Sequence, residues 1–317
     1  MKVIVISGPT ASGKTLTAIE LSKKFGGEIV NFDSLLLYRE INIGTAKPSI
    51  EERVSVPHHM IDVRSISQPM NASEYAHLAK PIVDGLLKEN KIVFLVGGSG
   101  FYLQALLKGM YDSPTTSTEI MARSEEIYHE KGIAPFLEIL KNHDPASFLL
   151  YHENDHYRIR RAVEHWWSNH TPISQARQQK DEMNKNLTKS NIHDWELLHI
   201  YLDLPKPEHQ LIIEDRTKKM LDAGLINEVK ELLDLGFSGK EKPLQSIGYK
   251  ETLDFIQNKM TSLQQLQAQI ITSTRQLAKS QRTWFNRDNT KITFHPLQQK
   301  NEILSTVHDF LISKKKI

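Results

Sequence analysis

The chain has no cysteine among its 317 residues. Disulfides, thiolate zinc sites and a cysteine nucleophile are therefore excluded, and a reducing compartment fits this composition. No segment approaches the ~18 consecutive apolar residues of a membrane span. The apolar run at the N-terminus ends after about five residues, which is too short for the apolar part of a signal peptide. We therefore expect a cytoplasmic protein that does not bind membranes.

The chain also has no strong excess of charge of either sign, because its formal net charge is only +2. This balance neither favours nor excludes a nucleic-acid partner. The distribution of charge is more informative, since residues 273–287 and 158–161 hold basic residues with no acidic residue between them. Arg275, Lys279 and Arg282 are spaced i, i+4 and i+7, which places them on one face of a helix. Such a face is either simply solvated or binds RNA phosphates.

A phosphate-binding loop follows the first apolar segment, residues 2–7. The loop matches G-x-x-x-x-G-K-[ST], a pattern whose backbone N–H groups converge on a phosphate or pyrophosphate. Its residues are Gly8, Pro9, Thr10, Ala11, Ser12, Gly13, Lys14 and Thr15. Lys14 adds a positive charge, and the Thr15 hydroxyl can ligate Mg²⁺. The motif predicts the first ligand but not whether the phosphate is transferred, hydrolysed or released.

The pattern of apolar residues predicts an α/β fold with a parallel sheet and flanking helices, like that of P-loop NTPases. Residues 113–195 are polar and helical in pattern, so we expect a helical insertion domain there within a core formed by 1–112 and 196–317. The predicted strands are 2–7, 28–33, 91–96, 199–204 and 291–294, and the predicted helices include 14–25, 208–235 and 263–285. Lys314–Lys316 reads as a frayed helix end.

Acidic residues at the strand ends separate the possible chemistries. An ATPase pairs its phosphate loop with a strand that ends in an acid, but residues 92–96 are followed by Gly97-Gly98-Ser99-Gly100. Asp33, after the second strand, is a metal ligand, a general base or an N-cap. His58 and His59 are adjacent in an extended segment and so point to opposite sides. This arrangement does not favour a shared metal.

Several further motifs resemble those of one enzyme family. After the phosphate loop they are Asp33-Ser34, Tyr38-Arg39, Ile43–Pro48, Pro57–Asp62, Leu95–Tyr102, His152–Asp155 with Arg158, Asp215-Arg216, Glu228-Val229, Gln245–Glu251, Thr274–Lys279 and Thr283–Phe285. In this order and spacing, the chain resembles the tRNA dimethylallyltransferases, also called tRNA isopentenyltransferases, over about residues 2–287. This series is far more specific than the phosphate loop alone.

The resemblance implies that a dimethylallyl group passes from dimethylallyl diphosphate to N6 of the adenosine 3′-adjacent to the tRNA anticodon. It implies that Asp33 accepts the amine proton and that Lys14 and Arg216 neutralise the diphosphate, with Mg²⁺ on Thr15. Ser99, where the family usually has Thr, would lie where the two substrates meet. A monomer that binds the anticodon stem-loop is expected. The implied tRNA-binding residues are Asp33, Ser34, Leu35, Leu36, Ser99, Tyr157, Arg158, Arg160, Arg161, Gln245, Gly248, Lys250, Arg275, Lys279 and Arg282.

Three other functions are compatible with parts of the sequence. A prenyltransferase acting on free adenine nucleotides would not need the helical insertion or the basic helix. A P-loop small-molecule kinase or ATPase predicts an acid after the third strand. A non-catalytic RNA-binding relative should have lost Asp33 or Lys14, and both are present.

Overall fold

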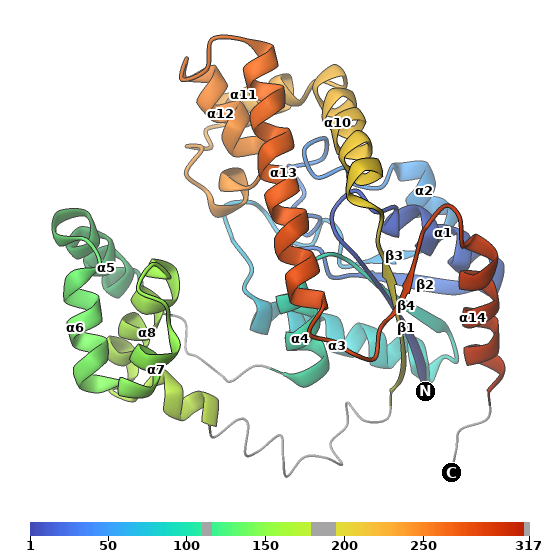
Figure 1. The fold of residues 1–317 in the computed structure, drawn as a ribbon, viewed down its shortest axis with the longest axis horizontal. Coiled ribbons are helices and arrows are strands. Elements are labelled where there is room, and N and C mark those ends of the chain that lie inside the picture. Colours follow the sequence, from blue (N-terminus) through green and yellow to red (C-terminus); the bar gives the residue numbers. More distant parts are fainter. Residues whose placement is uncertain (110–115, 179–194, 314–317) are drawn as a thin grey trace. The chain divides into compact units, whose positions relative to one another are not determined.

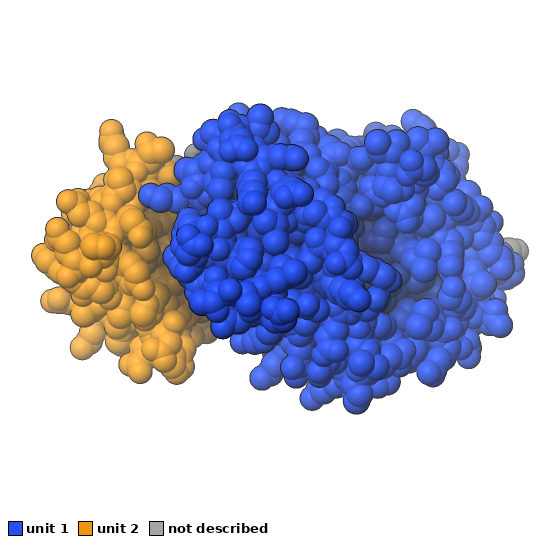
Figure 2. Space-filling model, turned by 90° about the horizontal axis from the view of Figure 1, so that it is seen from above, with its two compact units in different colours: residues 1–107, 194–317 blue, residues 108–193 orange. Residues whose placement is uncertain are grey.

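The computed structural model describes residues 1–109, 116–178 and 195–313. The chain divides into two compact units (Figure 2): residues 1–107 with 194–317 form unit 1, and residues 108–193 form unit 2. The expected domain boundary between residues 112 and 113 lies outside the described residues, as does the expected helix end at Lys314–Lys316.

Unit 1 is built on a six-stranded sheet in which all paired strands are parallel (Figure 1). The strand order is β3-β2-β4-β1-β5-β6. The strands are β1 (Lys2–Ser7), β2 (Gly27–Asn31), β3 (His58–His59), β4 (Ile92–Val96), β5 (Glu196–Leu202) and β6 (Ile292–Phe294). This confirms the predicted α/β fold with a parallel sheet, and it places the carboxyl ends of all strands at one edge.

Helices cover both faces of this sheet (Figure 1). Helices α1 (Lys14–Phe25) and α14 (Lys300–Ile312) contribute Leu21 and Ile303 to a core that also contains Ile4 and Ile6 of β1. On the other face lie α3 (Ala72–Lys88) and α4 (Gly100–Lys108), whose Tyr75 and Tyr102 rings stack with centroids 4.9 Å apart. Burial of β-branched and aromatic side chains on both faces is typical of a parallel sheet.

The C-terminal part of unit 1 adds helices beyond the strand ends. They are α10 (Lys206–Asp222), α11 (Leu225–Asp234), α12 (Tyr249–Ile256) and α13 (Leu263–Phe285), whereas the short helix α2 (Ile50–Ser55) belongs to the N-terminal part, between β2 and β3. Helix α13 packs against α10 and α12. The single helix predicted over 208–235 is instead two helices, because Gly224 adopts a left-handed conformation with φ of +99° and starts a new helix.

Unit 2 is helical throughout its described residues 116–178 apart from short connections. Its helices include α5 (Thr118–Lys131), α6 (Ala134–His143), α7 (Pro145–Leu150) and α8 (His156–Asn169). They enclose a separate core that contains Phe136, Leu140, Ile159 and Val163. In the described part of the chain, no helix has the length and apolar character needed to cross a membrane.

Candidate active site at the phosphate loop

The phosphate loop connects the carboxyl end of β1 to the N-terminus of α1. A Cβ atom on Gly8 would lie 2.3 Å from the carbonyl oxygen of Leu202 on β5, so only glycine fits there. Gly13 has φ of +79° at the helix N-cap, where no side chain caps the helix. The positive end of the helix dipole and the unpaired N–H groups of the first turn are therefore available to an anion.

Lys14 is the one basic residue of this loop, and its surroundings change its pKa. Burial lowers the pKa of its ammonium to about 8, an effect that the carboxylate of Asp33 opposes and the guanidinium of Arg216 reinforces. Its Nζ donates a hydrogen bond of 2.7 Å to the carbonyl of Pro9. These interactions bring together three charged residues that the sequence separates widely.

Arg216 reaches the loop from α10. Its Nη1 donates to the Thr10 hydroxyl at 3.4 Å, and its Nη2 donates to the Thr45 carbonyl at 3.5 Å. Burial lowers the pKa of this guanidinium, while the nearby Asp33 carboxylate opposes that change. An arginine held beside a phosphate loop can neutralise an anion bound there.

Asp33 follows β2 at the same edge of the sheet. Its Oδ1 accepts a hydrogen bond of 3.1 Å from the backbone N–H of Leu35, which forms an Asx turn, and no helix begins at this position. Its own N–H donates to Asn31 Oδ1 at 2.8 Å. Within the described residues, Oδ2 of Asp33 receives no hydrogen bond. One oxygen therefore orients the carboxylate, and the other is available to a substrate.

A pocket opens between these groups. On its polar side lie Lys14, Thr15, Asn31, Asp33 and His58. Its apolar side is formed by Ile29, Leu36, Pro48, Ile61 and Val96. The pocket therefore offers both charged groups and hydrocarbon surface, as expected for a ligand with an anionic and an apolar part.

The two adjacent histidines diverge, as their extended spacing predicts. His58 lines the pocket, and its Nδ1 lies 2.7 Å from the carbonyl of Val56. Its buried Nε2 has no partner among the described residues, and burial lowers its pKa. His59 instead lies 2.6 Å from Glu28.

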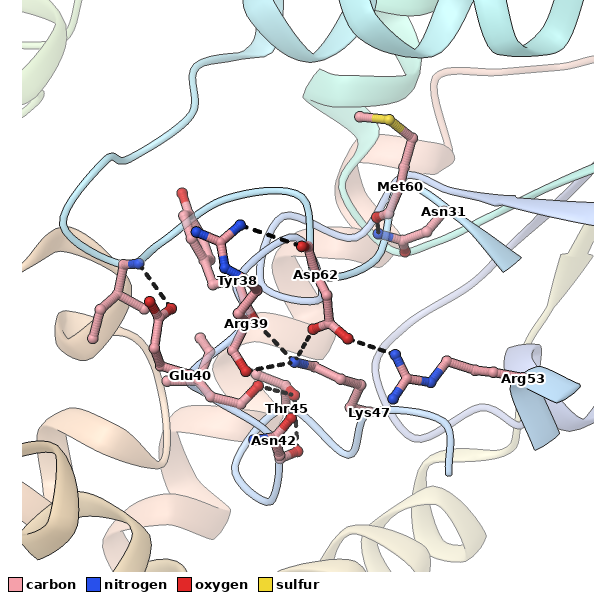
Figure 3. A network of polar contacts seen from close by, with 12 residues as sticks. Asn31, Tyr38, Arg39, Glu40, Asn42, Thr45, Lys47, Arg53, Met60 and Asp62 are labelled. Carbon is pink, nitrogen blue, oxygen red and sulfur yellow. Dashed lines mark hydrogen bonds and ion pairs between the residues drawn. The ribbon is translucent and has the colours of Figure 1, made fainter. Parts of the chain in front are cut away.

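A network of polar contacts supports the segment that follows β2 (Figure 3). Asp62 pairs with both Lys47 and Arg53, each at 2.5 Å, and Lys47 also donates to the carbonyl of Tyr38 at 2.7 Å. Lys47 is buried, and desolvation lowers its pKa although Asp62 opposes that shift. This network holds the turn that presents the Thr45 carbonyl to Arg216.

The loop after β4 lies close to other backbone and ring atoms. A Cβ atom on Gly97 would lie 2.6 Å from the backbone of Phe32, and one on Gly100 would lie 2.0 Å from the Trp284 ring. The half-buried Ser99 lies between these two contacts. The loop therefore has no room for the carboxylate that ATPases place at this strand end.

The three basic residues predicted to share one face of α13 have different environments. Arg275 and Lys279 are exposed. The side chain of Arg282 is only 19% exposed and pairs with Asp203 at 2.8 Å. Its guanidinium also donates to His209 of α10 at 2.7 Å, so Arg282 is held by neighbouring elements of the same unit, and its contact with RNA stays a prediction.

The remaining candidate RNA-binding residues of unit 1 are more dispersed. Gln245 and Lys250 are exposed near the start of α12, whereas Gly248 is buried with φ of +92° at the turn between them. The half-buried residues Ser34, Leu35 and Leu36 follow Asp33 directly. Gly248 thus allows the turn and presents no side chain.

The four candidate RNA-binding residues of unit 2 differ in exposure and in their partners. Tyr157 and Arg158 of α8 are exposed. Arg160 pairs with Glu125 at 2.6 Å, and Arg161 pairs with Glu164 at 2.7 Å. Arg158 also pairs with Asp155, at 3.1 Å, so all three arginines are engaged within the unit, and Arg158 has the most exposed side chain of the three, at 61%.

Two residues that sequence reasoning missed contact the phosphate loop directly. Gln281 of α13 accepts a hydrogen bond of 2.7 Å from the N–H of Thr10, and His209 of α10 lies 2.8 Å from the Thr10 carbonyl. Both residues lie on helices, and glutamine and histidine on a helix usually face solvent. No local sequence signal therefore distinguishes them.

The fold and the site define a class of protein: a parallel α/β protein with a phosphate loop, a carboxylate after β2 and no acid after β4. A family model described as IPP transferase matches residues 36–288. The chain belongs to the IPP transferase family. This result confirms the resemblance found in the sequence motifs.

Individual relatives agree with this assignment. The chain is 38% identical over 291 residues to tRNA dimethylallyltransferase 2 of Geotalea daltonii, covering 91% of this chain and 86% of the relative. It is 37% identical over 287 residues to tRNA dimethylallyltransferase 1 of Pelobacter propionicus, covering 90% of each.

Solved structures show the same similarity. The full-length tRNA isopentenylpyrophosphate transferase of Bacillus halodurans aligns with a TM-score of 0.69 at 29% identity, over 98% of this chain and 96% of that one. A eukaryotic dimethylallyltransferase acting on tRNA aligns with a TM-score of 0.77 at 26% identity, over 98% of this chain and 79% of that one.

Proposed function

We propose that the chain transfers the dimethylallyl group of dimethylallyl diphosphate to N6 of the adenosine 3′-adjacent to the anticodon of tRNA. The observation that carries this proposal is the Asp33 carboxylate, which has one oxygen available and lies in the same pocket as Lys14 and Thr15 of the phosphate loop. The names of the relatives from Geotalea and Pelobacter support the same reaction.

The phosphate loop suits the diphosphate of the donor. Backbone N–H groups at the start of α1, together with Lys14 and Arg216, can neutralise the charge that develops on the leaving group. The apolar side of the pocket, which includes Ile29, Leu36 and Ile61, suits a five-carbon chain. In this proposal the donor binds with its diphosphate on the phosphate loop and its reactive carbon toward Asp33.

The transfer requires one bond to break and one to form. The allylic C–O bond breaks, and pyrophosphate leaves with the electron pair. The adenine N6 atom supplies the pair for the new C–N bond, and its proton passes to Asp33. Since an allylic carbon can spread positive charge, the reaction depends on leaving-group stabilisation and on a positioned nucleophile.

The donor set at this site fits Mg²⁺ bound to a diphosphate. Thr15 lines the pocket beside Lys14, and a hydroxyl together with phosphate oxygens forms the hard ligand set that Mg²⁺ prefers. Among the described residues, no group of three or more His, Cys, Asp or Glu side chains could hold a metal ion by itself. When bound, Mg²⁺ adds positive charge that stabilises the leaving diphosphate.

The acceptor adenosine must leave the base stack to reach this pocket. The exposed basic residues Arg275 and Lys279 on α13 are suited to the phosphates of an anticodon stem-loop, as are Tyr157 and Arg158 of unit 2. Every residue assigned to the chemistry belongs to one unit of one chain, so we include a monomer in the proposal.

The proposal is tested by the fate of a labelled prenyl group. The enzyme is incubated with labelled dimethylallyl diphosphate, Mg²⁺ and either an anticodon stem-loop with adenosines 3′ of the anticodon or free AMP. We expect label in the RNA alone. Label in AMP instead would identify a free-nucleotide prenyltransferase, and phosphate release from ATP without prenylation would identify a kinase or an ATPase.

A further inference from the structure

Thr10, in the middle of the phosphate loop, is held at three atoms by side chains from two distant helices. Its N–H donates to Gln281 Oε1 at 2.7 Å. Its hydroxyl accepts from Arg216 at 3.4 Å, and its carbonyl oxygen lies 2.8 Å from His209 Nε2. Only Arg216 among these three was expected from the sequence.

Gln281 joins the phosphate loop to the loop after β4. While its Oε1 accepts from Thr10, its Nε2 donates to the carbonyl of Gly98 at 3.0 Å. A Cβ atom on Gly98 would lie 2.4 Å from this Nε2 atom and 3.7 Å from Asp33 Oδ2. The Gln281 amide group therefore bridges the phosphate loop and the loop after β4, which lies beside the Asp33 carboxylate.

The protonation of His209 follows from its partners. A carbonyl oxygen can only accept, so Nε2 of His209 must carry the hydrogen that bonds to Thr10. Nδ1 then has a lone pair, and Arg282 Nη2 donates to it at 2.7 Å. Arg282 is itself held by Asp203, whose Oδ1 accepts from Nε at 2.9 Å. The ion pair thus orients the histidine ring.

The geometry points to Gln281 and His209 as positioning residues that fix the two peptide groups on either side of Thr10 for donor binding, a role that rests on the proposed function. The Thr10 N–H belongs to the peptide group before this residue and the Thr10 carbonyl to the peptide group after it, so the two hydrogen bonds hold both peptide groups in place. The other N–H groups of the loop then stay directed toward the diphosphate, and their arrangement before binding reduces the cost of ordering the loop. Neither side chain needs to touch a substrate for this effect.

Gln281→Met tests the first of these residues, because methionine has a similar volume but makes neither hydrogen bond. We expect the KM for dimethylallyl diphosphate and the Kd for inorganic pyrophosphate each to rise about tenfold, the size expected from losing a positioned pair of hydrogen bonds. The Kd for the stem-loop RNA should stay within about twofold of wild type. Ser280→Ala is the matched control, since the exposed Ser280 hydroxyl bonds only to Gln276 of its own helix.

His209 is tested by comparing two substitutions. His209→Leu removes the donor to Thr10 and should raise the donor KM about tenfold, whereas His209→Gln retains a donor near the position of Nε2 and should restore most of the wild-type value. General loss of folded protein would lower kcat and leave KM unchanged. The KM change and the rescue by glutamine therefore distinguish positioning from overall stability.

The possible outcomes distinguish failure of the positioning role from failure of the proposed function. If Gln281→Met and His209→Leu keep the wild-type KM and pyrophosphate affinity, the positioning role is refuted although the enzyme still prenylates RNA. If wild-type enzyme binds no pyrophosphate and does not label RNA, the proposed function itself fails. Equal KM values for His209→Leu and His209→Gln, both raised, would refute the hydrogen bond to Thr10 as the cause.

Discussion

Replacing Lys14 with methionine should stabilise the free protein while abolishing donor binding. The ammonium of Lys14 is held at a pKa of about 8 because burial removes it from water, although Asp33 attracts it. The folded state without ligand therefore bears an energetic cost for keeping this group charged at neutral pH. A methionine of similar length removes the cost and also removes the charge that a diphosphate requires.

The magnitude follows from the difference between the folded and unfolded pKa values. A fall from 10.5 to about 8 corresponds to about 3 kcal/mol at pH 7, since each pKa unit is 1.36 kcal/mol. Methionine leaves the Pro9 carbonyl without its donor, which costs about 1 kcal/mol. We therefore expect Lys14→Met to be about 2 kcal/mol more stable than wild type at pH 7.

The pH dependence has a definite sign. Between pH 8 and 10.5 the unfolded chain keeps the Lys14 proton while the folded chain loses it, so the wild-type stability contributed by this group rises with pH. The advantage of Lys14→Met should therefore shrink across this range. Above about pH 10.5 only the lost hydrogen bond to Pro9 remains, so the wild type should be the more stable protein by about 1 kcal/mol. Other titrating groups are common to both proteins and cancel in the difference.

Urea unfolding at pH 7, 9 and 10.5, with pyrophosphate binding measured by calorimetry, checks both parts. Lys24→Met is the control, because Lys24 is exposed at the opposite end of the same helix. A lower stability of Lys14→Met at pH 7, or a difference that does not vary with pH, would refute the reasoning. Pyrophosphate binding that survives the substitution would refute the role of Lys14 as a diphosphate ligand.

The site yields three further predictions. Asp33→Ala should lower single-turnover prenylation ~100-fold or more and leave RNA binding intact, since losses of a general base are of that size. Neutralising Arg275 and Lys279 together should reduce the salt slope of RNA binding by about 1.4, as expected for two phosphate contacts on single strands. Gly8→Ala should weaken pyrophosphate binding more than tenfold, because its Cβ would collide with the Leu202 carbonyl and displace the loop.

Each of these three has its own measurement and control. Quenched-flow prenylation of the stem-loop measures the Asp33 variant, and an unchanged rate would exclude a proton-accepting role. Filter binding over a range of salt concentrations measures the RNA affinity of the variant in which Arg275 and Lys279 are neutralised. The control is the double variant Lys23→Gln, Lys24→Gln on α1. Equal salt slopes for the two variants would show that α13 does not contact RNA. Equilibrium dialysis measures Gly8→Ala, and wild-type affinity would contradict the steric argument.

Helices with strong local signals were predictable from the sequence. The predicted bounds of residues 14–25 and 263–285 match α1 and α13, where Gly26 and Ser262 cap the ends. The two-residue strand β3 was missed because its pairing depends on β2 rather than on its own pattern. The break at Gly224 was missed because an isolated glycine also occurs within continuous helices.

The site was predictable only where its chemistry is local in the sequence. The phosphate loop is a contiguous motif, so its position is evident from the sequence, and its placement at the same edge as Asp33 follows from a parallel sheet, in which the carboxyl ends of the strands share one edge. Helical periodicity correctly put Arg282 on a defined face of α13, but it cannot say which neighbour covers that face. Gln281 escaped prediction because its partner Thr10 lies 271 residues away. Such contacts arise from tertiary packing, for which a single sequence shows no local pattern.

The close contact between Gly100 and Trp284 gives this enzyme an internal optical reporter. The indole lies against the backbone that carries Ser99, while Phe101 approaches its ring edge-on with centroids 6.4 Å apart. The chain has only three other tryptophans. Replacing Trp166, Trp167 and Trp195 with phenylalanine would leave a single fluorophore beside the loop that follows β4. Its emission can then follow the arrival of each substrate separately, in real time and without a label.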